Sequence, residues 1–217
     1  MDRNKPLASL TSPKGTAVYP NLNKPSIKFD NDGVYEIKLR IKKEDCGAFI
    51  KEIEGLYEAN YKAKCEEKGS KRKRADLPFK DVLDKDTDKP TGEVEFKFKM
   101  KASGTRQDGN RWEQRPKIFD GAGNPMPKPG HKLPNIGSGT TCKVAFEVRG
   151  WDAPIGVGIS LKLKAVQIID LIEFGGSADA SSFGFSSEGE AIETVSSEPA
   201  VAVKETTEET TSESYEF

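Results

Sequence analysis

Lysines alternate with apolar side chains along one short stretch of the chain, Glu93–Lys101. Lys97, Lys99 and Lys101 stand two residues apart, and the residues between them are apolar. In an extended strand such residues share one face, so their ammonium groups form a row with a spacing of roughly 7 Å. A row of cations at this spacing can neutralise the phosphates of a nucleic-acid backbone.

Further cations and two tryptophans follow this row. From Thr91 to Lys164 the chain holds 13 basic and 7 acidic residues. Binding of single strands without sequence preference needs a cationic groove along the backbone and aromatic rings on which bases stack. The residues that offer these contacts, and that we predict to bind nucleic acid, are Lys97, Lys99, Lys101, Arg106, Arg111, Trp112, Lys117, Lys143, Arg149 and Trp151.

Each of these features also has an ordinary structural explanation. Alternating lysines are the usual solvated face of a strand, and either Trp112 or Trp151 can belong to a core. Phe96 and Phe98 fit a core better than a stacking surface, because they share the face of other apolar residues. A second basic run, Lys71–Arg74, fits a phosphate contact or a solvated loop.

Residues suited to catalysis or metal binding are sparse. His131 is the only histidine, and it stands in a loop rich in proline and glycine. The cysteines Cys46, Cys65 and Cys142 have neither metal-type nor redox spacing, which favours free thiols in a reducing compartment. No phosphate-binding G-x-x-x-x-G-K-[ST] loop occurs. We therefore expect no catalysis, no metal and no cofactor.

Charge is divided unevenly along the chain. Residues 178–217 hold one of the 34 basic side chains of the chain and ten of its 35 acidic side chains. The net charge of −1 for the whole chain therefore combines a positive body with a negative tail. The strongly positive body attracts polyanions, and the acidic tail can imitate one. The tail ends in Tyr215-Glu216-Phe217, and a tail needed only for solubility has no use for the two aromatic residues.

Alternating patterns predict the strands that position these residues. Strands are expected over Val34–Ile41, Glu93–Lys101 and Thr141–Arg149, and a run rich in β-branched residues and leucine predicts another over 159–174. A turn at 107–110 is expected to lead into a hairpin strand over 112–119.

One long helix is also predicted. Asp45 is the expected N-cap, apolar residues at three- and four-residue spacing form one stripe, and Gly69-Ser70 ends the helix after Lys68. The first 25 residues contain four prolines and fit an extended arm. Five or so strands with one helix are typical of a mainly β fold, and we expect a five-stranded OB-fold barrel, whose open face can hold a nucleic-acid strand.

The length suits one domain with an appendage. We expect a binding domain over residues 1–177 and a disordered acidic tail over 178–217. No apolar run approaches the roughly 20 residues that span a membrane, and the N-terminus lacks the apolar core of a signal peptide.

Several short motifs, in this order along nearly the whole chain, resemble the single-stranded DNA-binding proteins of T-seven-like short-tailed phages (gene 2.5 product type). The match includes Gly33-Val34-Tyr35, Glu58-Ala59-Asn60-Tyr61, Leu77-Pro78-Phe79, the strand with Phe96-Lys97-Phe98-Lys99, Ile136-Gly137-Ser138-Gly139, Trp151 and Phe174-Gly175-Gly176. An acidic tail that ends in phenylalanine completes the resemblance. The tail departs from the family pattern in using Glu spaced by Ser and Thr, and Arg149-Gly150 stands where a second aromatic residue is expected.

The resemblance implies an OB-fold homodimer that binds single-stranded DNA during phage replication, recombination and repair, in the cytoplasm of the infected bacterial host. It gives Trp151 the place of an aromatic residue in the DNA groove. It also implies that Tyr215, Glu216 and Phe217 dock on the replicative DNA polymerase and the helicase-primase. Two alternatives come from other classes: a scaffold or chaperone-like adaptor that binds no nucleic acid, and an OB protein for single-stranded RNA.

Overall fold

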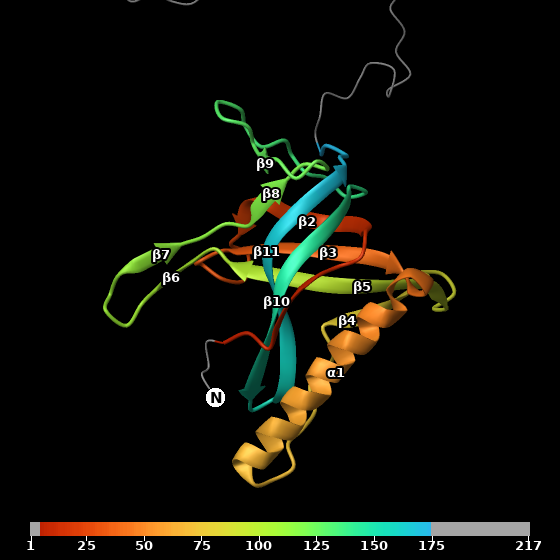
Figure 1. Ribbon diagram of the computed structural model, residues 1–217, viewed down its shortest axis with the longest axis vertical. Coiled ribbons are helices and arrows are strands. Elements are labelled where there is room, and N and C mark those ends of the chain that lie inside the picture. Colours follow the sequence, from red (N-terminus) through yellow and green to blue (C-terminus); the bar gives the residue numbers. More distant parts are fainter. Residues whose placement is uncertain (1–4, 175–217) are drawn as a thin grey trace, which may run out of the picture. The chain divides into compact units, whose positions relative to one another are not determined.

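The computed structural model describes residues 5–174. Within them, five strands form a closed ring (Figure 1). In ring order they are β2 (Gly15–Ser26), β3 (Val34–Lys42), β5 (Pro90–Lys101), β11 (Gly156–Asp170) and β10 (Thr141–Ala153). Thr141 and Cys142 of β10 pair with β2, which closes the ring, and within the ring the β5–β11 pair alone is parallel. This mainly β structure with one helix confirms the predicted OB-fold barrel.

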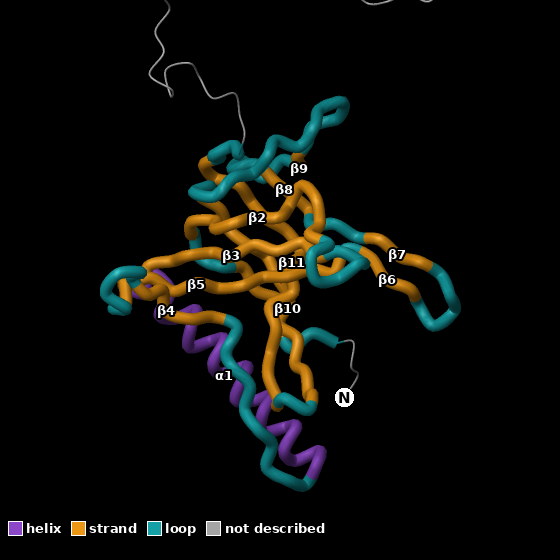
Figure 2. Tube along the Cα trace, turned by 180° about the vertical axis from the view of Figure 1, so that it is seen from behind, coloured by secondary structure: helices purple, strands orange, loops and turns teal. Residues whose placement is uncertain are grey.

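Shorter strands attach to the outside of the barrel. β1 (Ala8–Thr11) pairs with β10, and β4 (Phe79–Leu83) pairs with β5. β8 (Lys117–Phe119) runs parallel to β11, and β9 (Pro125–Met126) pairs with β8. β6 (Ser103–Thr105) and β7 (Arg111–Glu113) form a separate hairpin that projects from the barrel at the end of β5 (Figure 2).

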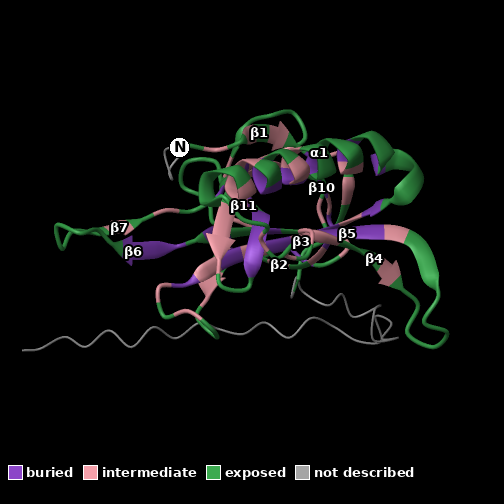
Figure 3. Ribbon diagram, turned by 90° about the horizontal axis from the view of Figure 1, so that it is seen from below, coloured by how far each residue is buried: buried purple, intermediate pink, exposed green. Residues whose placement is uncertain are grey.

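The helix α1 (Lys43–Lys68) lies against the strands with a narrow stripe of its surface buried, while its opposite side is exposed (Figure 3). Glu44 and Asp45 in the first turn and Lys68 in the last turn match the helix dipole. The left-handed conformation of Gly69 ends the helix, as predicted, and its N–H donates to carbonyls of the last turn.

Aromatic side chains join α1 to the barrel interior. The ring centroids of Phe49 and Phe96 are 5.1 Å apart, and those of Phe98 and Phe146 are 4.9 Å apart. Phe96 and Phe98 have no exposed surface, which confirms their expected place in the core. These rings fix the barrel interior, so the alternate residues of the same strands must face outward.

The β10–β11 hairpin extends beyond the ring and lies along the second half of α1 (Figure 1). Asn60 of α1 donates a hydrogen bond of 3.0 Å to the carbonyl of Gly158. The segment after the helix also pairs with β11, because Ala75 donates its N–H to the carbonyl of Val157. The hairpin tip is therefore held from two sides.

The structure differs from the sequence-based expectations at several boundaries. The expected N-terminal arm contains β1 and the barrel strand β2, because Pro20 and Pro25 fall at register shifts, between the residues of β2 that pair with β3. The helix N-cap is Lys42, which makes no side-chain capping bond, and Asp45 lies inside the first turn. Within the expected strand over 112–119, only β7 pairs back in the hairpin, whereas β8 joins β11. The predicted tail lies outside the described residues.

Candidate nucleic-acid interface

The predicted lysine row lies on the outer surface of the barrel. Lys97, Lys99 and Lys101 are exposed along β5, and the residues between them are buried. Lys38 lies directly opposite Lys97 on β3, and Arg40 follows two residues later. These side chains point away from the core, so the strand alternation seen in the sequence has placed five cations on one surface.

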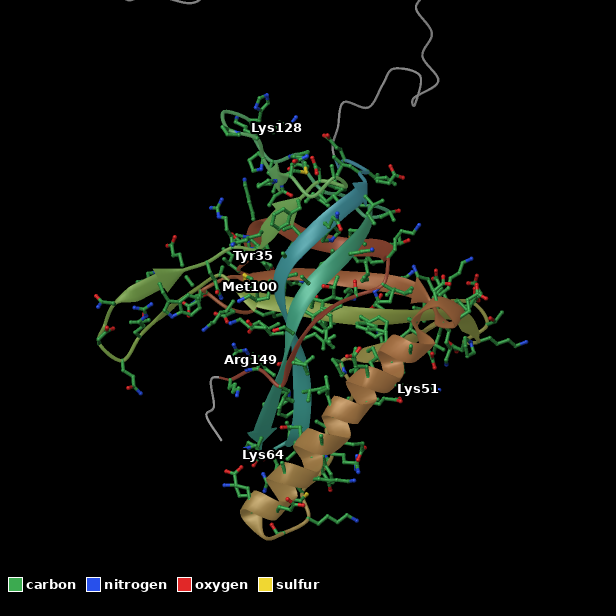
Figure 4. The ribbon with its side chains drawn as sticks, viewed as in Figure 1. Tyr35, Lys51, Lys64, Met100, Lys128 and Arg149 are labelled. Atoms are coloured by element: carbon green, nitrogen blue, oxygen red, sulfur yellow. The ribbon has the colours of Figure 1, made fainter. Side chains whose placement is uncertain are left out.

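Charged side chains continue across the sheet from β3 and β5 onto the β10–β11 hairpin. Four directly paired positions form a line over four neighbouring strands: Glu36, Lys99, Lys162 and Glu147. Lys164 and Arg149 flank this line on β11 and β10. Figure 4 shows that Arg149 projects from the hairpin on the side away from α1. We call the surface formed by Lys38, Arg40, Lys97, Lys99, Lys101, Arg149, Lys162 and Lys164 the cationic face.

Trp151 lies on the same surface at the tip of the hairpin. A Cβ atom on the preceding Gly150 would point into Asn60 of α1, so alternation directs Trp151 away from the helix. Trp151 pairs directly with Gly158, and its half-buried indole ring occupies the space beside that glycine. The ring is held by the backbone beneath it and still has exposed surface for stacking.

Trp112 has the same kind of support on the β6–β7 hairpin. It pairs directly with Gly104, and an added Cβ there would stand 2.7 Å from the ring atom Cζ2. Arg111 beside it is exposed, and Arg106 lies exposed at the hairpin turn. The β6–β7 hairpin starts directly after β5, so these residues extend the lysine row past Lys101.

The turn over residues 27–33 lies beside the β6–β7 hairpin. A hollow of about 390 Å³ separates them, with Ile27, Asp32 and Arg111 in its lining. Phe29 at the turn is 92% exposed, and the ammonium of Lys28 is 5.3 Å from its ring centroid. Tyr35 and Met100, a directly paired couple, mark this end of β3 and β5 in Figure 4. An aromatic ring this exposed can stack with a base.

Carboxylates pair with most of these cations. Glu36 contacts Lys97 and Lys99, and Asp32 contacts Lys101 at 2.9 Å. The hydrogen bond to Asp32 raises the pKa of Lys101. Glu147 contacts Arg149 and Lys164, and the hydrogen bond from Arg149 lowers the pKa of Glu147.

Burial lowers the pKa of Lys162, and repulsion from Arg149 and Lys164 adds to this effect. Burial is the larger cause of the lowered pKa, and the repulsion of Lys162 by Arg149 exceeds its attraction to Glu147. An anion such as a phosphate is favoured at a point of this kind.

Two predicted residues lie farther along the outer surface. Lys117 on β8 pairs with Ala165, and Lys143 on β10 pairs with Gln167, so both lie beyond Lys164 on the way to the other end of β11. The basic run Lys71–Arg74 is partly structural. Arg72 contacts Asp152 at 2.6 Å, and Arg74 pairs with Glu58 and lies 4.0 Å from the ring centroid of Tyr61.

Sequence reasoning missed Lys38, Arg40, Lys162, Lys164 and Phe29. The first four alternate with buried residues in strands that the sequence did predict, so the alternation itself was a usable signal. Phe29 belongs to a turn with no periodic pattern. Within residues 5–174 no cluster of His, Cys, Asp or Glu is arranged to hold a metal ion, and none of the helices there is long and apolar enough to span a membrane.

Comparison with known proteins identifies the family of the chain. Residues 14–171 match the family model described as the single-stranded DNA-binding protein of bacteriophage T7. The chain belongs to this family. The family consists of DNA-binding proteins, which confirms the prediction of a binding protein without catalytic activity.

Solved structures agree with this membership. The crystal structure of gp2.5, a single-stranded DNA-binding protein encoded by bacteriophage T7, shares 27% identity with a TM-score of 0.64, covering 86% of this chain and 99% of that one. The single-stranded DNA-binding protein of bacteriophage Enc34, solved in complex with single-stranded DNA, shares the fold at 20% identity and a TM-score of 0.54, covering 77% and 89%. A comparison with curated proteins gives no significant match.

Proposed function

We propose that single-stranded DNA binds along the cationic face, without sequence preference, during replication of a phage genome. The observation that carries this proposal is the register that sets Lys99 beside Lys162. It joins the lysine row of β5 to the hairpin that carries Trp151. Cations for the backbone and supported rings for the bases are the two contacts that such binding needs.

The positions of the aromatic residues suggest a path for the strand. It would run from Trp151 past Arg149 and Lys162, cross to Lys99 and Lys101, and continue toward Trp112 and Phe29. Arg106, Arg111, Lys117 and Lys143 would add contacts at its edges. The Enc34 protein supports this proposal, because it has the same fold and was solved with single-stranded DNA.

The tail is the proposed partner-binding segment, next to a DNA-binding domain over 1–177. Ten acidic residues in 178–217 favour competition for the cationic face when DNA is absent. Tyr215, Glu216 and Phe217 would then dock on the replicative DNA polymerase and the helicase-primase. We further propose a homodimer that acts in the cytoplasm of the infected host, in recombination and repair as well as replication.

Titration of the full chain with oligothymidine, followed by tryptophan fluorescence at increasing NaCl, tests the DNA proposal. We expect quenching and an affinity that falls steeply with salt. A flat trace at low salt would contradict the proposal and favour the scaffold function. Competition between oligothymidine and oligouridine of equal length decides between DNA and RNA.

A further inference from the structure

Four carboxylates on the cationic face share one arrangement, in which the two oxygens of one carboxylate contact two different cations. Glu36 has Oε1 3.3 Å from Lys97 Nζ and Oε2 3.2 Å from Lys99 Nζ. Glu147 has Oε2 2.7 Å from Arg149 Nη2 and Oε1 3.1 Å from Lys164 Nζ.

The same arrangement recurs at both ends of the β3–β5 surface. Asp32 has Oδ2 2.9 Å from Lys101 Nζ and Oδ1 3.9 Å from Arg111 Nη2. Glu95 lies 3.3 Å from both Lys38 and Arg40, again through different oxygens. One carboxylate between two cations is therefore found across the cationic face, on β3, β5, β10 and β11.

A backbone phosphate has the same outline as these carboxylates. It carries one negative charge and presents two oxygens that are not part of the sugar linkage. A pair of cations arranged around one carboxylate therefore has the geometry and the charge to hold a phosphate in its place. The Lys97–Lys99 and Arg149–Lys164 pairs each keep a net positive charge once their carboxylate is counted. The Lys101–Arg111 pair does not, because Asp30 lies 3.7 Å from Lys101 in addition to Asp32.

Burial divides the carboxylates into two kinds. Glu95 is 6% exposed and is locked beneath its cations. Glu36, Asp32 and Glu147 keep 22%, 33% and 15% of their side-chain surface exposed. The pairs of Asp32 and Glu36 reach solvent and contribute little stability. Glu147 is more buried but keeps exposed surface, so a competing anion can reach and displace all three side chains.

We propose that Asp32, Glu36 and Glu147 hold the places of three backbone phosphates in the free protein and swing aside when single-stranded DNA binds. This inference rests on the proposed function, because it assumes DNA on the cationic face. The three carboxylates then lower the affinity for DNA, because the DNA backbone must displace them. Their pairing with the cations also makes the salt dependence shallower than the number of cations suggests, because a cation already paired with a carboxylate releases fewer counterions.

The test compares the full chain with three variants in oligothymidine titrations at several NaCl concentrations. Glu36→Gln and Glu147→Gln remove one competing charge each while keeping the side-chain size. Asp81→Asn is the matched control, since it removes the same charge from a 2.9 Å ion pair with Lys43 at the start of α1. We expect each Gln variant to bind about three- to fivefold more tightly at low salt. The slope of the logarithm of the binding constant against the logarithm of the NaCl concentration should steepen by up to about 0.7 for each released cation. The control should change neither the affinity nor this slope.

Two outcomes would overturn the inference: unchanged or weaker binding by both Gln variants, or equal tightening by Asp81→Asn. The first means that the carboxylates only orient the cations, and the second means that total charge alone matters. Lys99→Ala in the same series distinguishes a failure of this inference from a failure of the proposed function. If Lys99→Ala weakens binding while the Gln variants do not tighten it, the inference alone fails. If Lys99→Ala has no effect, both fail. Thermal unfolding confirms that each variant is folded.

Discussion

The indole ring of Trp112 occupies the space above Gly104, the residue directly opposite it in the β6–β7 ladder. Trp151 and Gly158 repeat this relationship in the β10–β11 ladder. Both glycines are buried beneath rings that remain half-exposed. Two hairpins thus present a tryptophan in the same way, with the backbone of the partner strand as its support.

Filling the space beneath Trp151 should displace the ring. Gly158→Ala places a methyl group where the indole lies, and such overpacking typically costs about 1–3 kcal/mol of unfolding free energy. Urea unfolding measures this loss. Gly55→Ala in α1 is the control, because no atom lies within 4 Å of the added methyl and the change should stabilise the helix by roughly 1 kcal/mol. Equal urea midpoints for Gly158→Ala and wild type would contradict the packing described.

Each tryptophan should report on DNA separately. The chain has two tryptophans, so Trp112→Ala and Trp151→Ala each leave one fluorescent reporter. We expect either change to weaken oligothymidine binding by about 1–3 kcal/mol, the contribution of one stacked base. The corresponding Phe variants should retain most of the affinity, because stacking needs only a ring. Wild-type affinity for Trp151→Ala would remove that residue from the interface.

Removing one lysine from the row should change the salt dependence as well as the affinity. For Lys99→Ala we expect weaker binding to oligothymidine and a salt slope lower by about 0.7, the value for one lost phosphate contact on a single strand. Lys51→Ala serves as the control, because Lys51 is exposed on α1 (Figure 4). Similar slopes for the two variants would place the DNA elsewhere.

Glu147 should make stability depend on pH in a defined direction. Its hydrogen bond from Arg149 lowers its pKa in the folded state, so the ionised carboxylate stabilises the fold above the ordinary pKa of about 4.3. That contribution is lost as the pH falls through the lowered pKa. The difference in urea midpoint between wild type and Glu147→Gln should therefore be present at pH 7 and shrink toward pH 3. A difference that is constant over this range would contradict the assignment.

Removing residues 178–217 should tighten DNA binding at low salt, because the deleted segment carries ten acidic residues and one basic residue. Deleting Phe217 alone should leave DNA affinity nearly unchanged and weaken capture of the replicative polymerase in a pull-down. Unchanged affinity of the truncated chain at low salt would exclude competition by the tail.

Strand alternation made much of this structure predictable. The outward lysines of β5 and the buried Phe96 and Phe98 follow directly from a period of two. What the sequence does not encode locally is which strands become neighbours. The parallel pairing of Leu161 with Phe98 sets Lys162 beside Lys99, although more than 60 residues separate them in the chain. The barrel strand β2 was missed for a different reason, because its prolines interrupt the alternation and its pairing with β3 shifts register at those points.

Chemical footprinting of the lysines tests the central claim most directly. The full chain is acetylated with and without bound oligothymidine, and the modification of each lysine is read by mass spectrometry. Binding on the cationic face predicts protection of Lys97, Lys99, Lys101 and Lys162, with Lys51, Lys62 and Lys68 of α1 modified equally in both samples. Protection of the α1 lysines with an unchanged β5 row would contradict it.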